Sequence, residues 1–254
     1  MTESNDDDKT IEYYNGDRYE GQKDKQGRPH GHGVYTHHNE RGQIQQGKYD
    51  GEWEDGEKHG NGKHWYRNGD IYEGPWENGK RHGSNGTYTY YKHDSHQDIS
   101  LSYEGQWKHD QKHGQGIMMF TNGDKYQGQW ENGQMCGNKD DSTYTHHDKQ
   151  IYHGKFTNDT KHGKGKIIYD NGDIYQGGFK NGKRHGKGTY TFKQTGIATE
   201  GLYENDKRTT YKVVKAKQHS SDTETTDHVQ RQTTTTTTTI ATTKKSYANL
   251  EDSN

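Results

Sequence analysis

The sequence has few aliphatic side chains, a single cysteine and two prolines among its 254 residues. Hydrophobic residues make up only 22% of the chain, and aromatic residues, at 11%, account for half of them. So few Leu, Ile and Val residues exclude the thick aliphatic core of an ordinary α/β or helical enzyme. One cysteine excludes an intrachain disulfide and is consistent with a reducing compartment, so we expect a cytoplasmic protein.

Long hydrophobic runs and an excess of charge of one sign are also missing. No stretch approaches the ~18 apolar residues of a transmembrane helix, and the start, MTESNDDDKT, lacks the apolar region of a secretory signal. The chain carries 35 basic and 37 acidic residues, a formal net charge of −2, which disfavours a nucleic-acid partner. The composition therefore leaves two alternatives: disorder, or an unusual fold built from aromatic residues and glycine.

The 34 glycines favour the second alternative, because they recur with aromatic residues at fixed spacing. A unit Tyr-x-Gly-x-aromatic is followed by His-Gly, and two degenerate copies, at Tyr19 and Thr199, flank six clean ones. The structural repeat motif comprises Tyr49, Gly51, Trp53, His59 and Gly60; Tyr72, Gly74, Trp76, His82 and Gly83; Tyr103, Gly105, Trp107, His113 and Gly114; Tyr126, Gly128 and Trp130; Tyr152, Gly154, Phe156, His162 and Gly163; and Tyr175, Gly177, Phe179, His185 and Gly186.

This pattern resembles the MORN (membrane occupation and recognition nexus) repeat, in eight copies between residues 13 and 208. The resemblance is specific, because it rests on spaced aromatic, glycine and histidine residues in six clean copies. It departs at Lys23, where the second aromatic is missing, at Cys136, which replaces the histidine, and in the weak last copy. Atypical terminal copies are expected of capping repeats, so only Cys136 marks an internal irregularity.

The motif predicts strands. Side chains alternate along a strand, so Tyr49, Gly51 and Trp53 share one face, and Gly51 leaves a gap for a neighbouring aromatic ring. The fold class is then all-β: an elongated single-layer antiparallel sheet of tandem β-hairpins, the MORN-repeat ribbon. The expected parts are a disordered acidic N-terminus at 1–12, the repeat domain at 13–208, and a Thr-rich, mostly disordered, low-complexity tail at 209–254.

The register of the hairpins has two alternatives. A two-residue turn at Asn68-Gly69 pairs Trp65 with Tyr72, whereas a three-residue loop with Gly69 left-handed pairs Trp65 with Ile71. We favour the second register, because it also pairs His64 with Tyr72 and sorts the aromatic residues onto one face.

That register places an apolar stripe on the face opposite the aromatic one. The candidate partner-binding residues are Trp65, Ile71, Met119, Ile168 and Ile174. One hypothesis is that this stripe docks a partner segment or the chain's own tail. The alternative, weighted equally, is a partly covered second face that only helps packing and solubility.

Histidines raise the question of a metal site. The longer connections hold the pairs His37 and His38, His93 and His96, and His146 and His147. Adjacent rings rarely reach one ion, and successive loops should lie roughly 20 Å apart, so we expect neither metal nor cofactor. For the repeat histidines we expect a structural role, a hydrogen bond from the ring to the backbone of the turn.

Basic residues precede most of the repeat histidines, and they are candidates for an edge that binds anionic lipid: Lys58, Lys80, Arg81, Lys112, Lys161, Lys183 and Arg184. Such a row could attract phosphoinositide headgroups. Acidic residues lie nearby and the net charge is slightly negative, so we favour a solvated turn.

The sequence contains no phosphate-binding loop, nucleophile elbow or zinc-protease motif, so we expect no enzyme activity. The function we expect is a non-catalytic scaffold that binds protein partners, with self-association left open. Similar proteins occur in cytoskeletal and ciliary assemblies, including radial spoke heads, which implies such a location by analogy. The alternative is a peripheral adaptor on anionic phospholipid surfaces.

Overall fold

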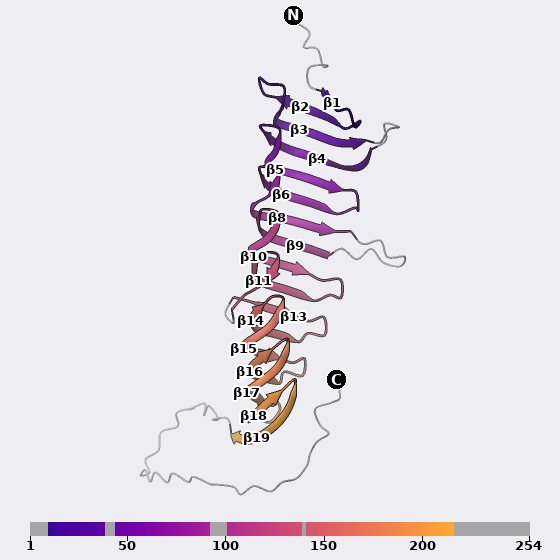
Figure 1. Cartoon of the computed structure of the whole chain (residues 1–254). Helices are drawn as coiled ribbons and strands as arrows, with labels where there is room; N and C mark the ends of the chain where they lie inside the picture. The colour runs from indigo at the N-terminus through magenta and orange to yellow at the C-terminus, as the bar shows by residue number, and fades with distance from the viewer. Residues whose placement is uncertain (1–9, 39–43, 92–100, 139–140, 216–254) are drawn as a thin grey trace, which may run out of the picture. The chain divides into compact units, whose positions relative to one another are not determined.

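The computed structural model describes residues 10–38, 44–91, 101–138 and 141–215 as one open antiparallel sheet (Figure 1). The chain divides into two units, residues 1–216 and 217–254, and the second lies outside the described residues. The described part contains no helix, and its nineteen strands follow one another in chain order. The predicted all-β ribbon of hairpins is therefore confirmed.

Most copies of the repeat form one hairpin. The strands are β1 (Thr10–Glu12), β2 (Arg18–Lys23), β3 (Pro29–His38), β4 (Ile44–Glu54), β5 (Glu57–Tyr66), β6 (Ile71–Glu77), β7 (Lys80–Arg81), β8 (Gly83–Tyr90), β9 (Leu101–Lys108), β10 (Gln111–Met119), β11 (Lys125–Glu131), β12 (Gln134–Met135), β13 (Thr143–Thr145), β14 (Ile151–Thr157), β15 (Thr160–Ile168), β16 (Ile174–Lys180), β17 (Lys183–Thr191), β18 (Ile197–Glu204) and β19 (Lys207–Lys215).

The sheet is longer than the repeat domain expected at 13–208. At one end β1 pairs with β2, and at the other β19 pairs with β18 up to Lys215. Disorder was expected at 1–12 and 209–254, but residues 10–12 and 209–215 of these segments form strands. Residues 1–9 and 216–254 lie outside the described residues.

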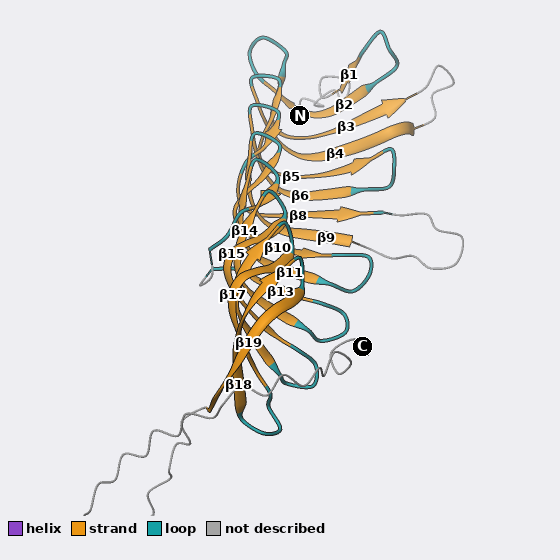
Figure 2. Ribbon diagram, turned by 60° about the horizontal axis from the view of Figure 1, so that its bottom comes forward, coloured by secondary structure: helices purple, strands orange, loops and turns teal. Residues whose placement is uncertain are grey.

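Two kinds of turn alternate between the edges of the sheet (Figure 2). On one edge the residues after the Trp form two-residue turns with both φ angles positive, as at Asp55 (53°) and Gly56 (89°). That conformation suits a type I′ hairpin. On the other edge the Asn-Gly-Asp loops have a left-handed glycine, with φ of 87° at Gly69.

The register confirms the loop that we favoured. Trp65 pairs with Ile71 and His64 pairs with Tyr72 across β5 and β6. Ile168 likewise pairs with Ile174 across β15 and β16. Because side chains alternate along a strand, this register separates an aromatic face, the side of Tyr49 and Trp53, from a second face, the side of Trp65 and Ile71.

The repeat tyrosines form the floor of the core. Each lies flat along its strand with its hydroxyl bonded to the backbone, as Tyr49 Oη donates to the carbonyl of Glu52 at 2.9 Å. Beneath the ring lie paired glycines, Gly51 and Gly62, where a Cβ on Gly51 would come within 2.7 Å of that hydroxyl. Glycine is therefore required at both positions, and seven of the repeat tyrosines are at most 1% exposed.

The Trp and Phe of each copy stand between two such tyrosines. Trp53 makes edge-on contacts with Tyr49 at 5.2 Å and Tyr19 at 5.3 Å, and its indole nitrogen donates to the carbonyl of Gly33. The same contacts continue through Trp76, Tyr72, Trp107, Tyr103, Trp130, Tyr126, Phe156, Tyr152, Phe179, Tyr175 and Tyr203. This ring ladder stabilises a single layer, since each edge-on pair contributes about 0.5–1.5 kcal/mol beyond its buried area.

Candidate binding faces

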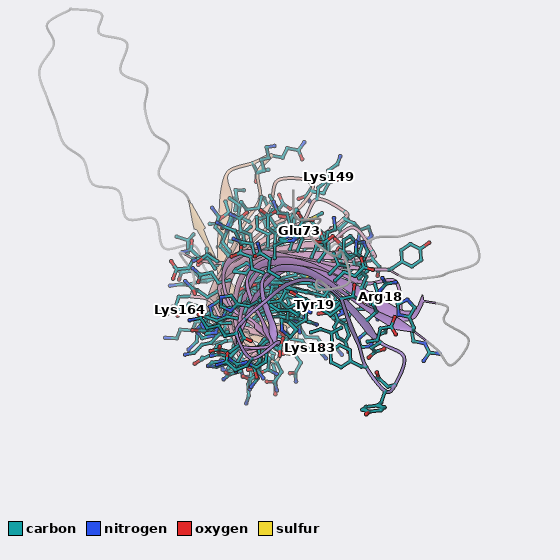
Figure 3. All side chains as sticks on the ribbon, turned by 90° about the horizontal axis from the view of Figure 1, so that it is seen from above. Arg18, Tyr19, Glu73, Lys149, Lys164 and Lys183 are labelled. Atoms are coloured by element: carbon teal, nitrogen blue, oxygen red, sulfur yellow. The ribbon has the colours of Figure 1, made fainter. Side chains whose placement is uncertain are left out.

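The two faces of the sheet differ in how they are covered. Tyr19 and Glu73, which lie on opposite faces by the register, are labelled in Figure 3, where the ribbon is seen from above. The aromatic face is covered by the chain's own side chains. The second face carries no covering segment among the described residues.

Cations lie on top of the ring ladder, at positions that the sequence analysis named as candidates for a lipid-binding edge while favouring a solvated turn. Lys58 Nζ lies 5.0 Å from the ring centroids of both Tyr49 and Trp76. Lys112 Nζ lies 4.1 Å from the centroid of Trp130. Burial lowers the pKa of Lys58 to about 8. Lys112 and Lys161 also have lowered pKa values for the same reason.

The two arginines of this set bind the next turn as well as the rings. Arg81 lies 4.3 Å from the ring centroid of Trp107, and its Nε donates to Asp110 Oδ1 at 3.0 Å. Arg184 repeats this arrangement with Tyr203 and Asp206.

Five of the seven candidate lipid-edge residues therefore face the aromatic side chains rather than solvent. They are Lys58, Arg81, Lys112, Lys161 and Arg184. The electron-rich faces of the rings and the turn carboxylates hold these cations in place. Lys80 and Lys183 alone among the seven are exposed.

The repeat histidines act differently from our prediction. Among the described residues no hydrogen bond joins a repeat-histidine ring to the backbone, and His59 Nδ1 lies instead 3.2 Å from Glu54 Oε2. The backbone carbonyl of His59 lies 3.5 Å from the hydroxyl of Tyr49. Gly60, the next residue, has a φ of 53° and forms the bulge between β4 and β5. The His-Gly pair thus shapes the bulge through its backbone.

A set of four hydrogen-bonded aspartates, of which Asp17, Asp70 and Asp124 are buried, was missed by the sequence analysis. Asp70 accepts hydrogen bonds from the Tyr88 hydroxyl and the Tyr91 backbone nitrogen, both at 2.8 Å, and from Asn68. The equivalent pairs are Asp17 with Tyr35, Asp124 with Tyr144, and Asp173 with Tyr190. Asp70 directly follows the Asn68-Gly69 turn of the sequence analysis, and the other three aspartates stand in the same Asn-Gly-Asp motif.

These aspartates tie each loop to the long connection beside it. Burial alone would raise the pKa of Asp124, but hydrogen bonds from the His147 backbone and the Tyr144 hydroxyl outweigh it and hold that pKa well below its usual range. His146 and His147 both approach Asp124, at 3.4 and 3.2 Å. His93 and His96 lie outside the described residues. No group of three or more potential metal ligands occurs within the described residues.

The candidate partner-binding residues lie in one line across the second face. Successive register pairs join Trp65 to Ile71, Ile151 to Ile168, and Ile168 to Ile174. We call the apolar residues of this line between β5 and β16 the docking row: Trp65, Ile71, Met119, Ile151, Ile168 and Ile174. Ile151 was not among the residues that the sequence analysis selected.

The docking row is partly shielded. Met119 is 39% exposed, whereas Trp65, Ile71, Ile168 and Ile174 are half-buried. Two ammonium groups lie near the Trp65 ring, with Lys48 Nζ at 5.0 Å and Lys63 Nζ at 5.3 Å from its centroid. Polar residues such as Thr89 and Thr145 interrupt the row.

The tandem hairpins and their aromatic ladder define a repeat protein. Comparison with known protein families agrees with this class. The model of the MORN repeat matches residues 19–39, 49–71, 72–95, 103–125, 126–138, 152–174 and 175–194. The chain therefore belongs to the MORN repeat family. A search of curated proteins gave no match.

The shortened match at 126–138 falls where the fifth copy is irregular. There β12 ends at Met135 and β13 begins at Thr143, so β11 pairs first with β12 and then with β13. Ser142 Oγ lies 3.2 Å from the Tyr126 hydroxyl.

MORN repeats are consistent with a repeat scaffold that binds proteins or membranes. The described residues contain no helix with the length and hydrophobicity needed to cross a bilayer.

Proposed function

We propose that this MORN-repeat protein is a non-catalytic scaffold that binds protein partners through its second face. The observation that carries the proposal is the docking row, which runs from β5 to β16 on a face with no covering segment among the described residues. Cations cover the rings of the aromatic face, whereas the apolar side chains of the docking row remain partly accessible on the second face.

The pattern of the docking row supports a long, shallow contact. Apolar side chains on different hairpins are separated by hydroxyl and ammonium groups, a mixture typical of non-obligate protein interfaces. The hairpins hold these side chains at fixed spacing. A partner that reaches Trp65 and Ile168 together must span the strands from β5 to β15.

The experiment compares a docking-row variant with a polar variant of the same line. Trp65→Ala combined with Ile168→Ser should abolish partner capture while the sheet remains folded. Thr36→Ala combined with Thr191→Ala, two polar positions of the same line, should not. Proximity labelling with each tagged protein measures capture. The proposal would be refuted if both double variants labelled the same proteins to the same extent.

We further propose a cytoplasmic location in a cytoskeletal or ciliary assembly. The support is the opening copy, Tyr19 to Gly31, which resembles the first repeat of proteins found in such assemblies. Microscopy of the tagged protein tests the location, since axonemal, cortical and diffuse cytosolic signals differ. A diffuse signal would refute it.

A further inference from the structure

The second face carries an uneven distribution of charge along the ribbon. In its N-terminal half three cations are paired, Arg18 with Glu20 at 2.8 Å, Lys48 with Asp50 at 3.0 Å and Lys63 with Glu73 at 2.9 Å, whereas Lys80 and Lys108 lie on separate hairpins. Further carboxylates, such as those of Glu52 and Glu104, share this half of the face. The N-terminal half is therefore balanced or slightly acidic.

The C-terminal half of the same face has lysines without such partners. Among the described residues no carboxylate oxygen lies within 4.0 Å of the ammonium groups of Lys155, Lys164, Lys166 and Lys187. The neighbouring Lys212 is paired, with its Nζ 3.1 Å from Glu200 Oε2. Lys155, Lys164 and Lys187 are exposed, and Lys166 is half-buried. Four neighbouring ammonium groups thus face solvent without neutralisation.

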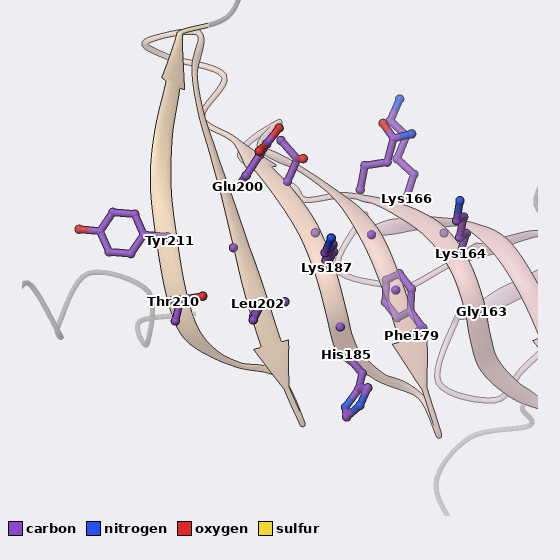
Figure 4. A pocket seen from close by; sticks show the side chains of 18 of the residues that line it. Gly163, Lys164, Lys166, Phe179, His185, Lys187, Glu200, Leu202, Thr210 and Tyr211 are labelled. Carbon is purple, nitrogen blue, oxygen red and sulfur yellow. The ribbon is translucent and has the colours of Figure 1, made fainter. Parts of the chain in front are cut away.

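Three of these lysines line a hollow in the sheet. The hollow has a volume of about 1650 Å³, and Lys164, Lys166 and Lys187 border it together with Gln176 and Thr189. Figure 4 shows Lys164, Lys166 and Lys187 on the strands around it, with Glu200, Leu202 and Thr210 toward β19. We call this region the lysine groove.

Glycine leaves the floor of the lysine groove without a side chain. Gly178 pairs with Lys164 and lies one strand from Lys187. Other copies have a larger residue at this position, such as Glu52 or Gln106, whose side chain accepts a backbone hydrogen bond. At Gly178 the backbone of His185 approaches too closely for a Cβ. Glycine is therefore required at this position, and the hollow lies where other copies carry a side chain.

We propose that the lysine groove binds an extended acidic segment of a partner protein. Lys164 and Lys166 are separated by about 6.6–6.8 Å along β15, the spacing of alternate side chains in an extended peptide. Lys164 and Lys187 lie two strands apart, or about 9–10 Å. Carboxylates on an extended chain that crosses the strands can therefore meet successive lysines.

The dimensions of the groove also suit a peptide. The strands from β14 to β19 cover about 24 Å across the sheet, and seven extended residues span at most about 25 Å. Gln176 and Thr189 offer hydrogen bonds to a peptide backbone along this path. A flat bilayer surface meets only the rim of a hollow, so the shape favours a polypeptide over a membrane.

This inference rests on the proposed scaffold function and adds the chemistry of one partner segment. The test uses the full chain and a fluorescein-labelled hepta-glutamate peptide, with hepta-glutamine as the neutral probe. Fluorescence anisotropy measures affinity at low and physiological salt. We expect hepta-glutamate to bind, with weaker binding at higher salt, and hepta-glutamine not to bind.

Two triple variants distinguish binding at the lysine groove from nonspecific attraction by the positive charge of the whole protein. Lys164→Gln, Lys166→Gln and Lys187→Gln should weaken hepta-glutamate binding by about fivefold or more, since each exposed ion pair contributes a few tenths to one kcal/mol. Lys48→Gln, Lys63→Gln and Lys108→Gln remove the same charge from the N-terminal half and should change affinity less than about twofold. Circular dichroism shows whether each variant is folded.

Three outcomes would overturn the inference: no binding of hepta-glutamate, equal weakening in the two triple variants, or lysine-groove-dependent binding of phosphatidylserine vesicles that exceeds peptide binding. Partner retention by the Trp65→Ala, Ile168→Ser variant would refute the docking row alone. The two proposals therefore fail in different measurements.

Discussion

The ring of Tyr152 lies on Gly165 of the next strand, where a Cβ would come within 2.5 Å of the ring carbon Cε2. Gly165 pairs with Gly154, and the Tyr152 hydroxyl crosses both glycines to reach the carbonyl of Lys155 at 3.0 Å. Each repeat tyrosine therefore requires two glycines, one on each of two adjacent strands.

We predict that Gly165→Ala lowers the free energy of unfolding by about 1–3 kcal/mol, the usual cost of overpacking a well-filled core. The added methyl group must displace the Tyr152 ring from its hydroxyl bond and from the edges of Phe156 and Phe179. Urea unfolding followed by tyrosine and tryptophan fluorescence measures the change. Gln176→Ala, at an exposed site on the neighbouring strand, is the control and should be nearly neutral.

A second prediction concerns the pH dependence of stability. Burial, with the nearby charge of Lys58, lowers the pKa of His64 to about 3. The neutral ring accepts a hydrogen bond from Lys58 Nζ at 3.1 Å. In the unfolded chain the histidine pKa is about 6.5, so the unfolded state binds more protons between pH 6.5 and 3. This group therefore makes the protein less stable as the pH falls through that window.

His64→Met should remove that contribution, because methionine occupies the equivalent place in another hairpin at Met118. Urea unfolding at several pH values between 7 and 4 should show a shallower loss of stability in the variant than in the wild type. His32→Gln replaces an exposed histidine on the second face and serves as the control. Parallel pH curves for wild type and His64→Met would contradict a neutral, buried His64.

A third prediction concerns anionic membranes. Arg81 and Arg184 are held by rings and by Asp110 and Asp206, so they are not available to headgroups in the folded sheet. We expect Lys80→Ala combined with Lys183→Ala to leave co-sedimentation with phosphoinositide liposomes unchanged at ~150 mM salt.

The quadruple variant that also replaces Arg81 and Arg184 with Ala should instead lose stability, measured by thermal unfolding. Membrane pelleting of the wild type that the exposed double variant abolishes would restore the lipid-binding edge as a working hypothesis. A quadruple variant as stable as the wild type would contradict the role of the two arginines.

The periodicity of the sequence predicted the fold. Each side chain of a strand lies on one of the two faces of the sheet, and the repeat spacing determines which face that is. The pairing of Trp65 with Ile71 followed from sorting aromatic residues onto one side, and the structure confirms it. For Lys58 we favoured a solvated turn, whereas its ammonium group lies over the Tyr49 ring, because the pattern gave its place at the turn but not the direction of a long, flexible side chain. Its position over Trp76 depends on the ring of the next hairpin.

The aspartates show another limit of sequence patterns. Asp70 stands in a turn motif that by itself explains an exposed aspartate, and its partner Tyr88 lies eighteen residues away. Only the register that brings β8 beside β6 shows that the carboxylate is buried. The lysine groove was missed for the same reason, since Lys164, Lys166 and Lys187 become neighbours only when β15 and β17 are placed around β16.

The alternation of hairpins has a consequence for how such a chain can grow or shorten. The aspartate–tyrosine pairs Asp17–Tyr35, Asp70–Tyr88, Asp124–Tyr144 and Asp173–Tyr190 occur in every second hairpin, and His64, Met118 and Ile167 fill the tyrosine's place in the others. Removing one hairpin would join two of the same kind. Removing two restores the alternation, so the modular unit in which length can change is 2 hairpins.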